Sequence, residues 1–459
     1  MRIQNISEIN NGRSAIRFAL PAIVMTVFMS TYSMIDGLFI SRYVGTDAVG
    51  ATNILLPIIC LATAIGFMFS SGGTAWIGRK MGMSKFEESR SDASLIILVA
   101  LVLSVIVALT SLTFMESLVR LLGADDVLFG YAYEYGIAIV IFFPLLVLQM
   151  VFGQFVIASG KPIHSMCSFI IGGVVNIILD YALIVCFGMG VMGAAVATGL
   201  GASVPVLAGI YILSREDCCL KLSKPSRNYR VLLGSCCNGV SEMISELSVA
   251  VTSLLFNLTM MEYAGADGVA AISIILYIQT FAVSAVVGYM MGTSAIIAFN
   301  YGAGNKKNLN MMFRNGLLLS SIISIISFSV LVLCGPELAS LFAEDSDNVR
   351  NLIEQGTFIF SFGFLMAGFN IFTSGIFTSL SDGKSSATVS LFRGLLVLVP
   401  SILLLSSSFG TIGIWFSVPV TEFVTMVVSL YLIHTKIPQY GIHIHGSEVS
   451  RLHKEIKEV

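Results

Sequence analysis

The stretch GTDAVGATNILLPI, residues Gly45–Ile58, returns 220 residues later as GADGVAAISIILYI, residues Gly265–Ile278. The match continues without a gap to Gly82 in the first copy and to Gly302 in the second. Ile and Leu matches between apolar segments are common by chance, so the shared GxDxV pattern and the shared glycines carry the evidence. The chain therefore contains two related halves.

The composition defines the environment of these halves. Apolar residues make up 56% of the 459 residues, charged residues make up 11%, and the mean hydropathy is +0.89. Soluble chains carry roughly a quarter charged residues. A chain with this few charges cannot cover a water-facing surface. Most of its surface must therefore face lipid. We expect no cleavable signal peptide, because the first apolar run, residues 15–40, is too long for one.

Apolar runs between polar breaks predict twelve membrane-spanning helices. About 20 helical residues cross a hydrocarbon core of ~30 Å, and each run is long enough. The predicted spans are 15–40, 51–75, 94–115, 131–156, 165–187, 191–213, 231–261, 269–297, 313–335, 352–375, 386–408 and 411–433.

The repeat offset covers six of these spans, an even number, so both halves have the same orientation in the membrane. The predicted fold is an all-α integral membrane protein of two six-helix bundles, related by a parallel pseudo-two-fold axis, with a central cavity between them. The predicted domains are a first bundle at 1–213, a cytoplasmic linker at 214–230, a second bundle at 231–434 and a cytoplasmic tail at 435–459.

The positive charges predict the orientation. With the N-terminus inside, every Lys and Arg except Arg42, Arg120 and Arg350 falls in a cytoplasmic segment, and Arg393 is counted among those cytoplasmic charges. Both termini are therefore expected in the cytoplasm, in a multi-pass protein of the plasma (inner) membrane. The expected partners are membrane lipid and a small-molecule substrate, with no nucleic acid, and the expected state is a monomer.

Acidic residues inside the first bundle suggest an ion site. A carboxylate in hydrocarbon is costly unless it faces a cavity or a partner. Asp36 and Asp180 lie at similar depth in the outer half of the first and fifth spans, Asn176 precedes Asp180 by one turn, and Thr198 returns to that depth on the sixth span. No Lys or Arg lies at this depth to neutralise the two acids. The four groups predict a site for H⁺ or Na⁺; the alternative is a structural hydrogen-bond network.

The second bundle has its own acids. Glu242 and Glu246 are four residues apart and share one helix face, so they could exchange protons or attract a cationic substrate. The alternative is a pair that reaches out from the inner end of a longer helix. Glu422 lies near mid-depth on the twelfth span and is predicted to stand alone. Pro21 predicts a kink in the first span, which could couple protonation of Asp36 to helix movement.

Together these residues resemble the MATE (multidrug and toxic compound extrusion) transporters, in the DinF-like and prokaryotic multidrug-efflux branch. The resemblance covers Ala15 to about His434 and rests on Pro21 followed by Asp36, on NxxxD ending at Asp180, and on GAAxAT ending at Thr198. It implies twelve helices and a V-shaped central cavity. It also implies a site for the coupling ion made by Asp36, Asn176, Asp180 and Thr198, with Tyr135 on the fourth span as a further candidate.

Two departures from the family pattern concern the second bundle. The family commonly places its acid on the seventh span further from the opening glycine than Glu246 lies from Gly239, which leaves open whether Glu242 or Glu246 takes that role. Asn370 stands where some branches carry an acid on the tenth span. This argues against a second-bundle sodium site like theirs.

The expected function is cation-coupled antiport, driven by H⁺ or Na⁺, that exports lipophilic cations by alternating access. No cofactor and no enzyme activity are expected, and no metal beyond the possible Na⁺. The alternatives are a metabolite exporter and a lipid-linked sugar or polysaccharide flippase of the same superfamily, although such flippases tend to have fourteen spans and cationic cavities. The substrate and the coupling ion stay open.

Three other classes of membrane protein fit less well. GRKMG at 78–82 resembles the basic loop of major-facilitator transporters, but the Asp that precedes it there is missing. The sequence has no HExxH, GxSxG, nucleotide-binding loop or Cys/His cluster, which disfavours an enzyme. A channel would not predict buried acids next to a kinked helix.

Overall fold

The computed structural model describes residue 9, residues 11–342 and residues 347–443, and these residues form helices joined by short connections. The helices are α1 (Gly12–Tyr43), α2 (Thr46–Ile54), α3 (Leu56–Gly82), α4 (Phe86–Thr113), α5 (Met115–Leu121), α6 (Phe129–Ile141), α7 (Phe143–Ala158), α8 (Pro162–Asp180), η2 (Tyr181–Cys186), α9 (Gly190–Ser214), α10 (Tyr229–Gly302), α11 (Lys306–Phe342), α12 (Asp347–Ser379), α13 (Gly383–Leu391), η3 (Phe392–Leu396), α14 (Leu398–Lys436) and η4 (Ile437–Tyr440).

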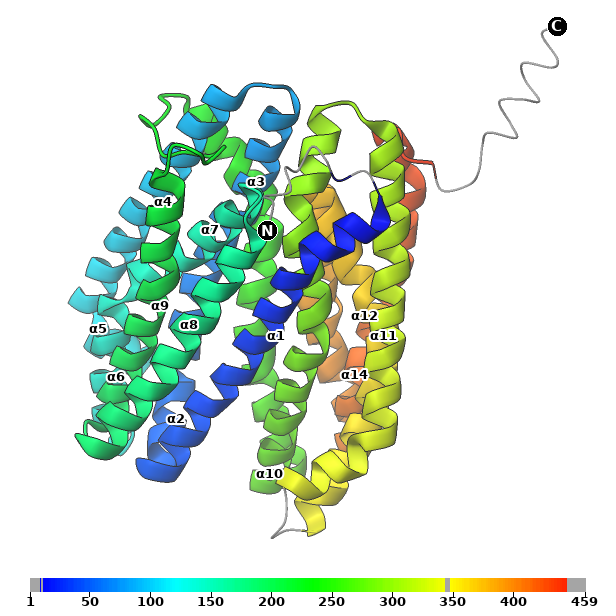
Figure 1. Ribbon diagram of the computed structural model, residues 1–459. Coiled ribbons are helices and arrows are strands. Elements are labelled where there is room, and N and C mark those ends of the chain that lie inside the picture. The colour runs from blue at the N-terminus through cyan, green and yellow to red at the C-terminus, as the bar shows by residue number, and fades with distance from the viewer. Residues whose placement is uncertain (1–8, 10, 343–346, 444–459) are drawn as a thin grey trace, which may run out of the picture.

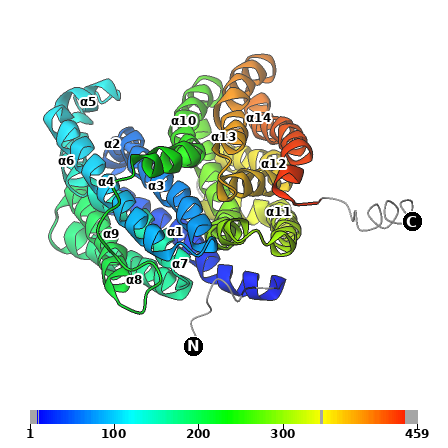
Figure 2. The ribbon, with the colours of Figure 1, turned by 90° about the horizontal axis from the view of Figure 1, so that it is seen from above.

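The helices form two bundles side by side, α1 to α9 in one and α10 to α14 in the other (Figures 1 and 2). Helices α3 and α10 pack against each other at the centre of the molecule. The division therefore follows the sequence repeat. The domain boundaries predicted at 213 and 434 stay predictions.

The number of membrane crossings follows from the helix lengths. Within the described residues, nine helices are long and apolar enough to span a membrane, and α6 with α7, bent by 47° at Phe142, makes a tenth candidate. Two of these ten, α10 and the stretch from Gly383 to Tyr440, are 74 and 58 residues long. Each contains a non-helical glycine, Gly265 or Gly410, with a positive φ.

Both long stretches fold back at their glycine. Near its two ends α10 meets the same helix, because Gly239 lies against Met68 of α3 and Gly302 against Arg79 of α3. A straight helix of that length would be ~110 Å long, whereas Met68 and Arg79 are separated by only three helical turns. Counting each folded stretch as two crossings gives the twelve that the sequence predicts.

The second stretch closes in the same way. The hydroxyl of Tyr440 donates to Asp382, 2.9 Å away, so the residues that precede α13 and follow α14 lie together. Only glycine adopts the φ of 59° at Gly410 without strain, which allows the tight reversal there.

Several predicted span boundaries differ from the structure. The spans predicted at 51–75 and 131–156 are each two helices, interrupted at Leu55 and Phe142. Pro57 and Pro144 stand in the first turn of the helix after each break, where the missing N–H of proline costs nothing. Pro21, in contrast, lies inside α1, which continues as a helix through it, so the predicted kink is not a break. Helix α4 begins at Phe86, eight residues before the predicted span, because its polar first turns extend beyond the apolar run.

Glycines allow the two bundles to touch backbone to backbone at one end. A side chain on Gly82 would overlap the carbonyl oxygen of Phe299, and one on Gly302 would overlap that of Arg79. Each glycine and each carbonyl has its counterpart 220 residues away, so the two contacts are related by the pseudo-symmetry of the repeat. We refer to these four residues as the glycine clasp.

Part of the linker at 214–230 packs against the first bundle. Leu220 and Cys218 are fully buried, the N–H of Ser226 donates to the carbonyl of Ser91, and Arg90 donates to the carbonyl of Cys219. The first part of the linker is therefore packed on the first bundle.

The described ends of the chain meet on one side of the molecule. Asn308, at the start of α11, donates to the carbonyl of Ile9, while Asn310 donates to the carbonyl of Gly441. Most of the tail predicted at 435–459 lies outside the described residues, which end at 443.

Candidate functional site

The first candidate site is built on α8. Asn176 and Asp180 follow one another by a turn and are both buried, at 2% and 0% exposure. The helix hydrogen bonds widen directly after Asp180 into the π-helical turn η2, so that Phe187 bonds back to Ala182. Such turns displace side chains from the regular helix register and are frequent at functional sites.

Small residues on α8 bring its two neighbours close. Gly172 faces the carbonyl of Gly201 on α9, and Gly201 in turn faces the Cβ atom of Asn176. This close approach leaves the amide of Asn176 3.5 Å from the hydroxyl of Thr198 on α9. On the other side of α8, Gly173 faces Phe28 of α1.

Packing of α1 on α8 joins the two acids. Asp36 and Asp180 are near enough to interact directly, and both act electrostatically on the buried Tyr135 of α6. The structure thus places together all five residues that the sequence and the family resemblance predict for the ion site. They come from four helices of the first bundle.

Several oxygen atoms of this cluster lack a protein partner. One carboxylate oxygen of Asp36, both of Asp180 and the amide oxygen of Asn176 are buried and, apart from the approach of the two carboxyl groups to each other, have no hydrogen-bond partner among the described residues. Buried oxygens left unpaired are costly, and the cost falls if a proton or a cation binds them. Carboxylate, amide and hydroxyl oxygens are the ligands of hard cations such as Na⁺. No group of three or more His, Cys, Asp or Glu side chains with metal-binding geometry occurs in the described part of the chain.

One acid of the second bundle contacts the first bundle. Glu246 accepts a hydrogen bond from Thr63 of α3, 3.4 Å away, and acts on Cys60 one turn earlier. Glu242 lies one turn from Glu246 on the same helix and within electrostatic range of Arg393. Glu246 therefore contacts the first bundle, whereas Glu242 lies nearer to Arg393 of the second bundle.

Glu422 does not stand alone, so this part of the sequence prediction is wrong. Its Oε1 atom accepts from Nε of Arg393 at 2.7 Å, and its Oε2 atom accepts from the amide of Asn370 at 2.7 Å. Ser429 completes the network by donating to Asn370 at 2.9 Å. Arg393, which the sequence prediction counts among the cytoplasmic charges, is thus paired with a buried acid of the second bundle.

Sequence reasoning missed Arg393, Asn370 and Thr63 as members of this region. Arg393 gave a signal, because it is the one basic residue within the predicted span 386–408. Asn370 stands at a position where the family resemblance draws attention, but nothing in the sequence pairs it with Glu422. Thr63 gave no signal, since single hydroxyl groups are common in membrane helices.

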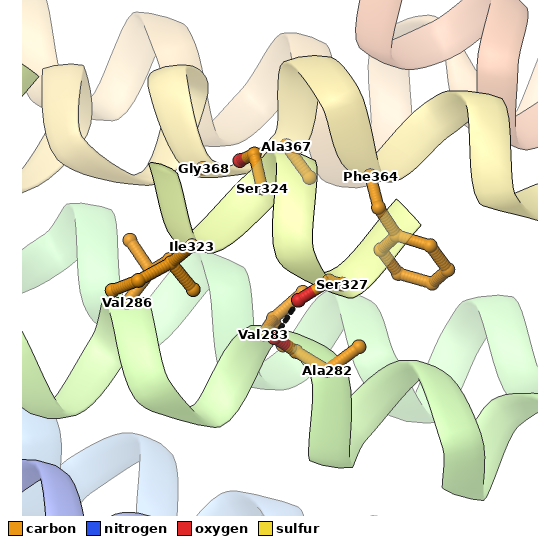
Figure 3. A pocket seen from close by; sticks show the side chains of 9 residues that line it. All are labelled: Ala282, Val283, Val286, Ile323, Ser324, Ser327, Phe364, Ala367 and Gly368. Carbon is orange, nitrogen blue, oxygen red and sulfur yellow. Dashed lines mark hydrogen bonds between the residues drawn. The ribbon is translucent and has the colours of Figure 1, made fainter. Parts of the chain in front are cut away.

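A small pocket lies elsewhere in the second bundle, between α10, α11 and α12 (Figure 3). Its lining is apolar apart from two serines. Ser327 donates to the carbonyl of Ala282 at 3.3 Å, and the buried hydroxyl of Ser324 has no partner among the described residues. It contains no charged group, so it is not a second candidate for the ion site.

Two repeated helix bundles with acids inside their spans define a multi-pass membrane transporter. Comparison with known proteins agrees. The family model described as MatE matches residues 21–182 and again residues 243–403, once in each half of the chain. The chain belongs to this family of MATE transporters.

Relatives and solved structures match almost the full length. The multidrug export protein MepA of Staphylococcus haemolyticus (strain JCSC1435) is 25% identical over 430 residues, which cover 92% of this chain and 93% of the relative. MepA of Staphylococcus aureus (strain NCTC 8325 / PS 47) is 23% identical, with 92% and 93% covered.

Among solved structures, a MATE transporter in complex with MaL6 superposes with a TM-score of 0.90 at 21% identity, covering 95% of this chain and 99% of the other. A MOP-superfamily transporter from Pyrococcus furiosus gives a TM-score of 0.88 at 21% identity, with 96% and 99% covered. These likenesses confirm the twelve-helix fold.

Proposed function

We propose that the protein exports lipophilic cations from the cytoplasm in exchange for H⁺ or Na⁺. The observation that carries this proposal is the cluster of unpartnered oxygens at Asp36, Asp180 and Asn176. In this mechanism the coupling ion binds the cluster from outside and pairs these oxygens, which favours a different packing of α1 on α8. The names of the MepA relatives, which are multidrug exporters, support the same class of substrate.

The acids between the bundles support a cationic substrate. Glu246 contacts Thr63 of the first bundle and Glu242 lies one turn away, so a molecule bound beside Glu246 would contact both halves. A cation placed there is attracted by two carboxylates in a region of low dielectric. A flippase for anionic lipid-linked sugars would instead need cationic groups at this position.

The orientation of the cycle follows from the positive charges. Excess Lys and Arg marks the cytoplasmic side, and the glycine clasp lies at that end, next to Arg79 and Lys80. The conformation described is then closed toward the cytoplasm. Movement of one bundle against the other would open the clasp and admit substrate from the cytoplasm.

The test is efflux of a cationic dye from proteoliposomes under an imposed pH or sodium gradient. We expect one of the two gradients to drive accumulation, and we expect Asp36→Asn and Asp180→Asn to abolish that dependence. Thr110→Ala, on the exposed face of α4, is the matched control and should leave transport unchanged. Transport that ignores both gradients would overturn the antiporter assignment, whereas wild-type coupling in both Asn variants would overturn only the ion site.

A further inference from the structure

The second bundle contains a buried ion pair whose acid is fully engaged. The Glu422 side chain is 5% exposed, and both of its carboxylate oxygens accept a hydrogen bond, from Arg393 and from Asn370. A carboxylate held in this way by a guanidinium and an amide is neutralised in place. It cannot also bind a substrate cation without losing these partners.

Arg393, in contrast, is only partly engaged. Its side chain is 25% exposed, and of its five N–H donors only that on Nε bonds within the described residues. The residue lies on η3, where Val397 bonds back to Phe392 in a wide π-helical turn. Gly394 brings this turn directly against Ser248 of α10.

This contact places Arg393 next to the acidic face of α10. Ser390 lies on α13, shortly before η3, and its hydroxyl accepts a hydrogen bond from the hydroxyl of Ser245 at 3.1 Å. This bond holds α13 against the same stretch of α10. Glu242 lies within electrostatic range of Arg393, and Glu246 lies one turn beyond Glu242. The Arg393–Glu422 pair therefore lies near two acids for which the described residues show no salt bridge.

We propose that Arg393 limits the charge of the exported substrate by neutralising Glu422 near Glu242 and Glu246. With Arg393 in place, the two acids of α10 alone attract the substrate, whereas without it Glu422 adds a third negative charge, whose attraction doubles for a substrate with two charges. Arg393 thereby disfavours dications relative to monocations. This inference rests on the proposed export of cations.

The size of the preference follows from Coulomb's law. One unit charge at roughly 10 Å, in a medium of effective dielectric about 20, changes the affinity for each ligand charge about tenfold. Removal of the Arg393 charge should therefore favour a dication over a monocation by about that factor.

Ethidium and propidium are suitable probes, because they share one ring system and carry one and two positive charges. Binding of each dye to the purified full-length protein is measured by fluorescence titration, so the readout does not depend on ion coupling. The variants are Arg393→Met, which removes the charge, Arg393→Lys, which keeps it, and the double variant Arg393→Met with Glu422→Gln, which removes both members of the pair.

We expect the ratio of propidium to ethidium affinity to rise about tenfold in Arg393→Met, to stay near the wild-type value in Arg393→Lys, and to stay near it in the double variant, where the net charge is unchanged. An unchanged ratio in Arg393→Met, or equal ratios in the single and double variants, would overturn the proposal. So would a wild-type protein that binds neither dye. If Arg393→Met does not fold, the double variant alone decides: a rise of about tenfold in its ratio of propidium to ethidium affinity would contradict the charge argument. Failure of gradient-driven efflux with intact dye selectivity would instead count against the proposed function.

Discussion

At the residue scale, the residues of the candidate ion site in the first bundle differ in the number of unpaired oxygen atoms that each could present to an ion. Asp180 offers two unpartnered carboxylate oxygens and Asn176 one amide oxygen, whereas Tyr135 acts on the acids only electrostatically. A lost hydrogen bond to a charged group costs about 1.5–3 kcal/mol, which is roughly tenfold or more in affinity.

We therefore expect Asn176→Ala to raise the ion concentration for half-maximal efflux by about tenfold, and Tyr135→Phe to raise it less. Both variants should retain the maximal rate, because neither residue faces the acids of the second bundle. The measurement is dye efflux at a series of pH values and sodium concentrations. A larger effect of Tyr135→Phe than of Asn176→Ala would contradict this order.

The Glu422–Arg393 pair makes a different prediction, about stability. Truncation of Glu422 to Ala leaves the Arg393 guanidinium and the Asn370 amide without their acceptor. Removal of one member of a buried pair costs roughly 3–5 kcal/mol, and the partial exposure of Arg393 places the cost at the low end. We expect a clear fall in the melting temperature of the detergent-purified protein, and a smaller fall for Ser429→Ala, which loses one neutral bond. A Glu422→Ala variant as stable as the wild type would show that the pair is not formed.

At the scale of elements, the glycine clasp decides which end of the molecule closes. Because a Cβ atom on Gly82 or Gly302 would overlap a carbonyl of the opposite bundle, Gly82→Ala with Gly302→Ala should hold the two helices apart. We expect the protein to fold, since each bundle is otherwise unchanged, but to favour the conformation open toward the cytoplasm and to transport poorly.

Spin labels on Lys85, in the loop that follows α3, and on Lys307, in the first turn of α11, would report this change as a longer distance between the two bundles. The matched control is Gly130→Ala in α6, where an added Cβ atom meets nothing within 4 Å. An unchanged distance distribution in the double alanine variant would mean that the clasp tolerates a methyl group and does not control closure.

The same elements show what sequence can and cannot predict. The repeat, the number of spans and the acids that meet in the first bundle could be predicted, because each is a local pattern or a charge in an apolar run. The breaks at Leu55 and Phe142 and the π-helical turns at Tyr181 and Phe392 were not, since they change helix direction or register without changing composition.

The pairing of Glu422 with Arg393 was missed for a related reason. Their separation is 29 residues, and no helical periodicity connects positions on two different spans. The chain reverses direction at Gly410, and this reversal brings the second half of α14, which carries Glu422, against the turn that carries Arg393. The sequence shows that Glu422 is acidic and Arg393 basic, but the fold determines that the two residues pair.

At the scale of the whole molecule, the two bundles should remain associated without a covalent connection. Backbone contact at the glycine clasp and the bonds from Thr26 to Ser284 and from Gln154 to Met291 join the bundles at several levels. The linker contributes little to this association, because its first part packs on the first bundle alone and residues 227–230 are exposed.

A protease site inserted between Arg227 and Asn228 tests this property. After cleavage we expect the two fragments to copurify in detergent and to retain dye efflux near the uncut level, because rocking of one bundle on the other needs the interface and not the peptide bond. The same insertion combined with Gly82→Ala and Gly302→Ala serves as the comparison, and its fragments should separate more readily. If the cut wild-type fragments separate, the linker rather than the interface holds the halves together, and closure at the clasp could not by itself gate the cytoplasmic side.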